Sequence, residues 1–141
     1  METIKNQSRR DAREGAMQAL FAYQYAEDTS KVFLSKFLKS FPKNKINIHF
    51  ISDIYLCVIK NSEWADNLIK KHLQNWELSR VALVDQVLLK MGACEIYFMD
   101  DIPPKVTISE MVEIAKVYST DESSSFVNGI LDSIFKDYTR K

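Results

Sequence analysis

Glycine and proline are scarce in this chain, with three of each among 141 residues. These residues supply the tight turns of sandwiches and barrels, so their scarcity disfavours an all-β fold. Long apolar runs are also missing, because none approaches the ~18 residues that a membrane-spanning helix needs. The first residues are polar and charged, unlike the apolar core of a signal peptide. We therefore expect a soluble, cytoplasmic protein with no membrane segment.

Net charge is absent too, because 19 basic residues balance 19 acidic ones. A neutral chain has no global field that attracts polyanions, so any nucleic-acid site must be a local basic patch. The charges are nonetheless uneven. Residues 29–52 hold five lysines and no acid, whereas residues 100–141 hold eight acids against five bases. The sequence is thus basic early and acidic late.

Recognisable catalytic and metal-binding patterns are missing as well. His49 and His72 form no ligand-spaced pair, and there is no glycine-rich phosphate loop or nucleophile motif. Cys57 and Cys94, the only cysteines, lie in apolar, helix-like stretches. That placement is typical of small buried hydrophobic residues in a reducing compartment. We expect no enzymatic activity, no metal and no cofactor.

What the sequence does contain is the apolar period of α-helices. A first helix is expected over Ser8–Ala26, with Ser8 as its N-cap, and a second over Ser30–Phe41, which Pro42 ends. An apolar-periodic stretch then covers Ile48–Trp76. The segment KNSEW near its middle predicts a kink or a break.

A central helix is expected next, over Val81–Met99, with Ser79 as its N-cap. Its apolar residues face nearly all sides, which is typical of a helix in the middle of a bundle. After the loop DDIPPK, the segment TISE reads as a capping box. In that interpretation Thr107 caps the following helix and Glu110 reaches back to the cap.

The last helix follows a second loop, STDESS, and contains Gly129, which costs about 1 kcal/mol relative to alanine inside a helix. A close helix–helix contact would explain that glycine. No alternating pattern of a strand occurs. The sequence therefore predicts an all-α fold, a single domain over residues 1–141 built as a compact bundle of about six or seven helices.

Three blocks of the sequence stand in a specific order. The chain opens with SRRDAREGAMQALFAYQ, continues with VLLKMGACEI, and ends with DIPPKVTISEMVEIAKVYSTDESSSFVNGILDSI. The last block carries a Pro–x–Lys–Val–x–Ile–x–Glu entry and then Phe–Val–Asn–Gly–x–Leu–Asp. Together these blocks resemble the NusB family of bacterial transcription antitermination factors, while residues 28–78 match only in helical character. The resemblance implies two packed helical subdomains.

The resemblance also implies a function. Members of this family bind a boxA element of nascent RNA together with NusE, a protein of the small ribosomal subunit, and join RNA polymerase antitermination complexes on ribosomal RNA operons. Carried over to this chain, the expected RNA-binding residues are Arg9, Arg10, Arg13, Lys105, Tyr118 and Phe126. The expected partner-binding residues are Phe21, Asp85 and Glu122. Some members form homodimers that cover their RNA surface, and the wide apolar helix faces here would permit one.

Two departures lower the positive charge of the expected RNA side. Asp11 stands where many relatives have a third consecutive arginine, and Ser124 and Ser125 replace a pair that is often His–Lys. An acid in the first helical turn also has an ordinary explanation, because it suits the helix dipole and pairs with nearby arginine. One alternative function is therefore a protein-interaction module of this fold with weakened or lost RNA binding. Another alternative puts the RNA on the lysine face between Lys31 and Lys45.

Overall fold

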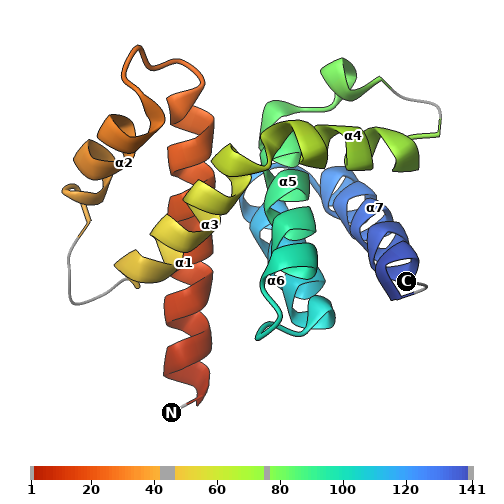
Figure 1. The fold of residues 1–141 in the computed structure, drawn as a ribbon. Helices are drawn as coiled ribbons and strands as arrows, with labels where there is room; N and C mark the ends of the chain where they lie inside the picture. The colour runs from red at the N-terminus through yellow and green to blue at the C-terminus, as the bar shows by residue number, and fades with distance from the viewer. Residues whose placement is uncertain (1, 42–46, 75–76, 140–141) are drawn as a thin grey trace.

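The computed structural model describes residues 2–41, 47–74 and 77–139, which form seven α-helices and one short 3₁₀ helix (Figure 1). In chain order they are α1 (Glu2–Tyr23), α2 (Ser30–Leu38), α3 (Ile48–Lys60), α4 (Ser62–His72), η1 (Leu78–Arg80), α5 (Leu83–Phe98), α6 (Pro104–Tyr118) and α7 (Asp121–Thr139). These ranges contain no strand, so the expected all-α fold is confirmed. None of the helices described is long and apolar enough to cross a membrane.

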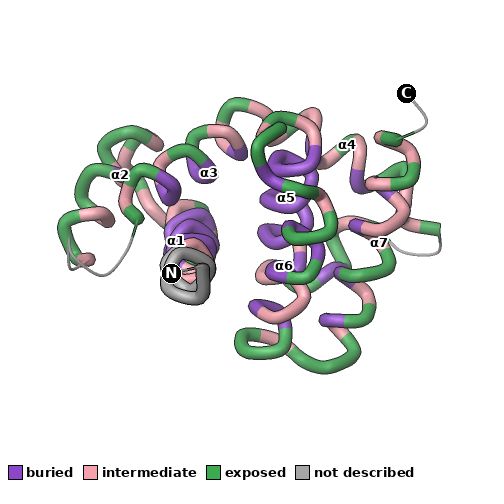
Figure 2. Tube along the Cα trace, turned by 90° about the horizontal axis from the view of Figure 1, so that it is seen from below, coloured by how far each residue is buried: buried purple, intermediate pink, exposed green. Residues whose placement is uncertain are grey.

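Helix α5 is the central element of the bundle, as its apolar sequence predicts. It packs against α1, α3, α4, α6 and α7, and ten of its sixteen residues are buried. In Figure 1, α1–α3 lie on one side of the molecule and α4–α7 on the other. Much of α1 and most of α5 are buried (Figure 2).

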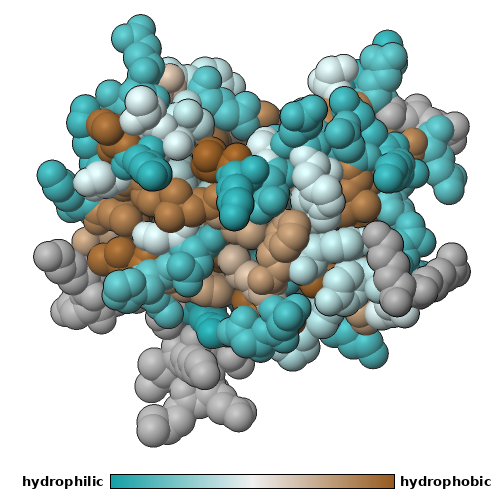
Figure 3. Space-filling view, in the orientation of Figure 1, coloured by the Kyte–Doolittle hydropathy of each residue, from teal (hydrophilic) through white to brown (hydrophobic). Residues whose placement is uncertain are grey.

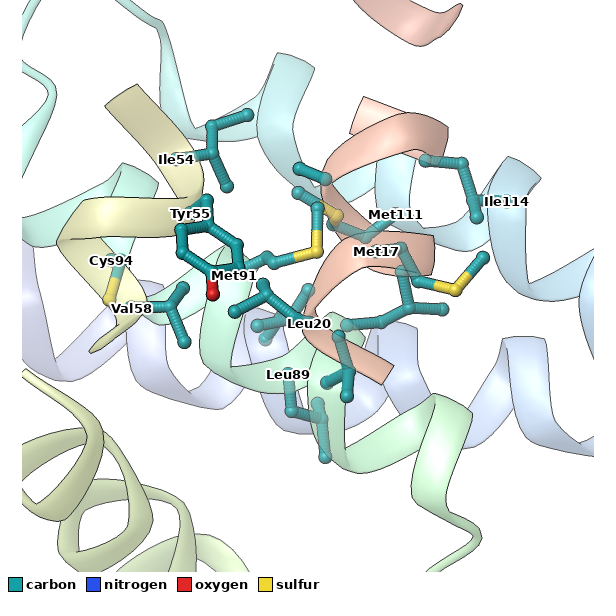
Figure 4. Packing of buried hydrophobic residues seen from close by; sticks show 14 of the residues in the cluster. Met17, Leu20, Ile54, Tyr55, Val58, Leu89, Met91, Cys94, Met111 and Ile114 are labelled. Atoms are coloured by element: carbon teal, nitrogen blue, oxygen red, sulfur yellow. The ribbon is translucent and has the colours of Figure 1, made fainter. Parts of the chain in front are cut away.

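The core forms where these helices meet. Met17 and Leu20 of α1 lie close to Leu89 and Met91 of α5, with Met111 of α6 behind them (Figure 4). Hydrophobic side chains also reach the surface over α2 and α3 (Figure 3). The core therefore joins the two sides of the bundle through α1 and α5.

Short polar side chains fix several helix ends. Asn47 accepts a hydrogen bond of 3.0 Å from the Phe50 amide and so caps α3. Asn61 lies between α3 and α4, where its side-chain amide donates to the carbonyl of Cys57 at 2.8 Å. The break expected within KNSEW is thus confirmed, because Asn61 ends one helix and precedes the next.

Several expected boundaries are wrong. Helix α1 begins at Glu2 rather than at Ser8. Helix α5 begins at Leu83, after the short helix η1, so Ser79 is not its N-cap.

Helix α1 ends at Tyr23 rather than at Ala26, and α2 ends at Leu38, before the expected end at Phe41. Helix α4 ends at His72. Pro42, the expected stop of the second helix, and Trp76, the expected end of the third stretch, lie outside the described residues.

The capping box is wrong for a structural reason. Helix α6 begins one turn earlier than expected, at Pro104, whose missing N–H is not needed in the first turn of a helix. Thr107 and Glu110 therefore lie inside α6, and both are buried. The spacing that resembles a cap instead places two polar side chains on the inner face of the helix.

The close approach expected at Gly129 occurs at another glycine. A Cβ atom on Gly129 would meet nothing within 4 Å, whereas one on Gly92 would lie 2.6 Å from a terminal methyl of Leu131. Leu131 is fully buried, so it has little room to move aside. It is Gly92, on α5, that lets α7 pack closely against the central helix.

These contacts predict opposite effects for two identical substitutions. Gly92→Ala should destabilise the protein by about 1–3 kcal/mol because the new methyl overpacks the core. Gly129→Ala should stabilise it by about 0.5–1 kcal/mol because alanine favours an open helix position. Urea unfolding followed by circular dichroism measures both. Equal effects of the two substitutions would contradict this assignment of the close contact.

Candidate nucleic-acid and partner interface

The three arginines at the start of the chain have different environments. Their side chains lie on α1 at exposures of 28% for Arg9, 44% for Arg10 and 1% for Arg13. Arg9 and Arg13 are one helical turn apart on the same face, and both guanidinium groups lie over the ring of Phe50, at 4.8 and 5.1 Å from its centroid. The motif therefore does not form one uniform basic surface.

Arg13 is an internal residue. Its Nε and Nη2 atoms donate to the two carboxylate oxygens of Glu95, each at 2.9 Å. Glu95 is fully buried and also accepts a 2.9 Å hydrogen bond from the hydroxyl of Thr107. The Nη1 atom of Arg13 lies 3.6 Å from Glu110. This buried network ties α1 to α5 and α6, so the expectation that Arg13 contacts RNA is corrected: its donors face the interior.

Arg10 is the outer member of the same network. Its Nε donates to Glu110 at 3.1 Å, and its Nη2 donates to the same carboxylate oxygen. The hydrogen bond to Glu110 raises the pKa of Arg10, although partial burial opposes that shift. Glu113 and Glu14 are also close enough to favour its charged form. Arg10 thus presents a partly exposed guanidinium whose orientation is fixed by a mostly buried acid.

Arg9 occupies a hollow beside the network. One of its terminal nitrogens lies 3.8 Å from Asp101, which is largely exposed. Together with His49, Asp53 and Cys57 it lines a cavity of about 560 Å³ between α1, α3 and the end of α5. Because acidic residues share this cavity, its charge is mixed rather than basic.

Tyr118, at the end of α6, is held by α1. Its hydroxyl accepts a hydrogen bond from Gln18 at 3.0 Å and donates one to Glu14 at 3.3 Å. Partial burial raises the pKa of both Tyr118 and Glu14. The Tyr118 residue is 38% exposed, so part of its ring faces outward. Tyr118 and Arg10 each connect α1 to α6. We name the surface formed by these two residues and their partners Glu14, Gln18 and Glu110 the α1–α6 seam, and Arg9 lies beside it.

A second candidate site lies where α5 begins and α7 starts. Here Asp85 and Glu122, both expected to bind a partner, line a pocket of about 280 Å³ with Phe126. Asp85 is 3% exposed, and its Oδ1 atom has no hydrogen-bond partner among the described residues. A buried acceptor left unpaired costs about 1–3 kcal/mol. We name this feature the acceptor pocket, because it can receive a hydrogen-bond donor.

The remaining expected residues lie apart from these two sites. Lys105 lines a groove of about 510 Å³ between α6 and α7. The same groove contains Ser124, which is buried, and Ser125. Phe21, near the end of α1, packs against Tyr25, which follows the helix, with ring centroids 5.8 Å apart. The structure thus distributes the nine expected residues over several surfaces, and Phe126 lies with the partner residues rather than with the arginines.

Histidine and cysteine placement differs in part from the expectation. His72 is the last residue of α4, as expected for a helix-end residue, but its ring is only 7% exposed, between Ser133 at 2.7 Å and Asp137 at 3.1 Å. Cys94 is fully buried as expected, whereas Cys57 is only partly buried. Within the described ranges no group of three metal-ligating side chains comes together.

Sequence reasoning missed the acids that hold the arginines. Glu95 is the one charged residue in the second half of α5, residues 91–98, and a buried acid needs a cationic or hydrogen-bonding partner. That isolated acid was the available signal. It could have indicated that one arginine of the opening motif points inward. Nothing local in the sequence identifies which arginine does so.

Comparison with known proteins identifies the family. The sequence model of the NusB family matches residues 10–136, and the chain belongs to that family. A transcription antitermination protein NusB of Chloroherpeton thalassium is 43% identical over 138 residues, which cover 95% of this chain and 64% of that relative. A protein of the same name from Salinibacter ruber is 37% identical, covering 92% of this chain and 82% of the relative. These names describe transcription factors rather than enzymes.

Solved structures agree with the fold. The structure of T. maritima NusB superimposes with a TM-score of 0.78 at 35% identity, covering 91% of this chain and 90% of that one. A structure of the antitermination factors NusB and NusE in complex with dsRNA has a TM-score of 0.81 at 22% identity, covering 94% and 98% of the two chains. The second likeness supports the fold alone.

The buried network predicts a large loss of stability when its acid is neutralised. Glu95→Gln should destabilise the protein by about 3 kcal/mol, because the buried Arg13 loses its main counter-charge. The matched change Glu113→Gln, which removes an exposed pair with Lys116, should cost less than about 1 kcal/mol. Urea midpoints measure the difference. A Glu95→Gln variant as stable as the Glu113→Gln variant would contradict the proposed role of the network.

Proposed function

We propose that this protein is a transcription antitermination factor that binds boxA-type RNA together with NusE. Membership of the NusB family and the names of its relatives support the proposal. The structural observation that carries it is the α1–α6 seam, where Arg10 and Tyr118 are both partly exposed and both anchored by neighbouring side chains. Anchored side chains lose little further freedom when they bind a ligand.

The seam offers the two contacts that single-stranded RNA uses most. An arginine guanidinium binds phosphate or stacks on an exposed base, and a tyrosine ring stacks on a base. Arg10 supplies the first of these contacts, Tyr118 supplies the second, and Arg9 adds charge beside them. Arg13 contributes indirectly in this proposal, because it helps to hold Glu110 and thus Arg10.

The charges around the seam indicate weak RNA binding by the protein alone. Glu110 shares the Arg10 guanidinium with any incoming phosphate, and Glu14 and Glu113 are close to it. Asp11 adds a further acid to the same turn of α1. Fewer net phosphate contacts give both a lower affinity and a flatter salt dependence. A partner that adds RNA contacts would then dominate the affinity of the complex.

The acceptor pocket is the proposed contact for NusE. Its buried, unpaired Asp85 oxygen and the exposed acid Glu122 favour a basic or amide side chain of the partner. Phe126 supplies an apolar wall for the stem of such a side chain. Phe21, which lies on α1 apart from the pocket, is a second proposed contact for the partner. We further propose that the assembled pair acts in the cytoplasm and joins the RNA polymerase antitermination complex.

A second candidate function is a protein-interaction module with weakened or lost RNA binding. The observation that favours it is the engagement of Arg10 by Glu110, which leaves the seam nearly neutral. Under this alternative NusE still binds, but RNA with a boxA-like sequence binds no better than a scrambled one. A homodimer that covers the seam would also bind both RNAs equally poorly. The molar mass of the free protein, measured by light scattering, distinguishes such a dimer from a monomer that has lost RNA binding.

Removing the charge of Arg10 tests the RNA site. Arg10→Ala should weaken binding of a boxA-like RNA by roughly 1–2 kcal/mol, about five- to thirtyfold, and lower the salt slope by about one. Fluorescence anisotropy with and without NusE measures this change against a scrambled RNA. Lys39→Ala removes the same charge from the exposed C-cap of α2, on the lysine-rich segment between Lys31 and Lys45, and is the matched control. An equal loss in the control would move the RNA to that lysine face.

Removing the unpaired acceptor tests the partner site. Asp85→Ala should reduce NusE affinity by about tenfold or more, because a buried donor of the partner would lose its acceptor. Its effect on stability should stay below about 1 kcal/mol, since no hydrogen bond of Oδ1 is lost. Titration calorimetry measures the affinity, with the exposed Glu63→Ala as the control acid. Unchanged affinity in Asp85→Ala would place NusE elsewhere.

A further inference from the structure

Three polar side chains of α1 face α6 along the seam. Arg10, Glu14 and Gln18 follow one another at intervals of four residues, so they lie on a single face of the helix. All three contact α6, because Arg10 binds Glu110 while Glu14 and Gln18 both bind the hydroxyl of Tyr118. A phosphate contact accounts only for the arginine, since a carboxylate repels phosphate. Base edges are the remaining part of an RNA that an acid and an amide can bind.

The hydrogen bonds of Tyr118 fix which atoms of Glu14 and Gln18 are left for a ligand. An ionised carboxylate only accepts hydrogen bonds, so the one O–H of Tyr118 donates to Oε2 of Glu14, at 3.3 Å. The Tyr118 oxygen then accepts from Nε2 of Gln18, at 3.0 Å. The Gln18 amide thus keeps its carbonyl oxygen and one N–H for another partner. Oε1 of Glu14 forms no hydrogen bond within the described ranges, and it can only accept one.

These atoms lie beside an accessible aromatic ring. Tyr118 is 38% exposed, Gln18 is exposed and Glu14 is half-buried. Since the hydroxyl at the tip of the ring binds Glu14, a base that stacks on the exposed part of the ring meets Glu14 with one edge. Asp11, one turn before Glu14 and also half-buried, places a second carboxylate on this side of α1. The edge of the stacked base therefore faces mainly acceptors.

Cytosine and uracil respond differently to such a surface. The two bases have the same size and ring shape, but cytosine carries an amino group where uracil carries a carbonyl oxygen. The amino group donates to a carboxylate, whereas the carbonyl oxygen finds no donor there and is repelled. Gln18 does not distinguish the two bases, because its remaining N–H and its carbonyl oxygen suit either one. The discrimination therefore falls to Glu14.

We propose that Glu14 determines base specificity in the seam by accepting a hydrogen bond from the exocyclic amino group of a base stacked on Tyr118, so that the site selects cytosine over uracil. The inference rests on the proposed RNA-binding function and deepens it. The Tyr118 hydroxyl and Gln18 are positioning groups, because together they hold the carboxylate towards α6. Arg10 is already paired with Glu110, so phosphate attraction is weak and the base contact carries a large share of the selectivity.

Two forms of the boxA-like RNA test the selection, with cytosine at every pyrimidine position in the C form and uracil in the U form. Fluorescence anisotropy at one moderate salt concentration, with and without NusE, should show that the wild-type protein binds the C form about fivefold more tightly. Glu14→Gln replaces one acceptor by an N–H donor that suits the uracil carbonyl. That variant should bind the U form about threefold more tightly than the wild type does, and its preference should fall to about twofold or less. A misfolded variant cannot produce such a gain in affinity.

Glu113→Gln is the matched control, because it removes the same charge from the exposed pair with Lys116 on α6. It should raise the affinity for both forms equally and leave their ratio unchanged. Equal binding of the two forms by the wild type, or a ratio that survives Glu14→Gln, would overturn the inference while RNA binding itself stands. If neither form binds, even with NusE, the RNA function fails and the base specificity fails with it.

Tyr118→Phe tests the positioning separately. It keeps the ring for stacking but removes the hydroxyl that holds Glu14 and Gln18. The C form should then bind about threefold more weakly, while binding of the U form should change by less than about twofold. An equal loss for both forms would show that the hydroxyl only supports the structure of the site, and it would overturn its role in base selection.

Discussion

The structure depends on one charge pair in its interior. The guanidinium of Arg13 and the carboxylate of Glu95 are almost completely removed from water, and isolated charges in such a place are very unfavourable. Two parallel hydrogen bonds and a third from Thr107 satisfy them. The pair therefore requires α1, α5 and α6 to meet in one arrangement. Because Glu110 contacts Arg13 on one side and Arg10 on the other, the position of the surface arginine follows from the position of the buried one.

In this arrangement the three arginines of the opening motif have different environments and different roles. Residues 9 and 13 are one turn apart and share a face, whereas residue 10 is displaced around the helix by about 100°. That displacement places Arg10 towards α6 and the solvent, while Arg13 enters the core. Arg9 lies between these extremes, stacked on Phe50. The role of each arginine in such a run can therefore be predicted only when it is known which side of the helix faces the core and which residues pack against it.

Patterns that act within a few turns were sufficient to predict the all-α fold, the central place of α5, the break near Asn61 and the family. Predictions failed where the deciding neighbour is distant in sequence. Thr107 and Glu110 have capping-box spacing, but their partners Glu95 and Arg10 lie on other helices. Gly129 and Gly92 are both glycines inside helices, and only the packing of Leu131 distinguishes them. The acceptor pocket likewise combines the beginnings of two helices that are far apart in the chain.

The arginines of the network are synthesised long before the acids that pair with them. Arg13 and Glu95 are 82 residues apart, and Arg10 and Glu110 are 100 apart. At a synthesis rate of about 5–20 residues per second, Glu95 is made roughly 4–16 s after Arg13, and Glu110 is made roughly 5–20 s after Arg10. During that time Arg13 has neither of its buried partners, and only the neighbouring acids Asp11 and Glu14 of the same helix are present to offset its charge. The arginine that is buried in the finished protein therefore begins as a solvent-exposed cation, and it leaves the solvent only after the last third of the chain has been made.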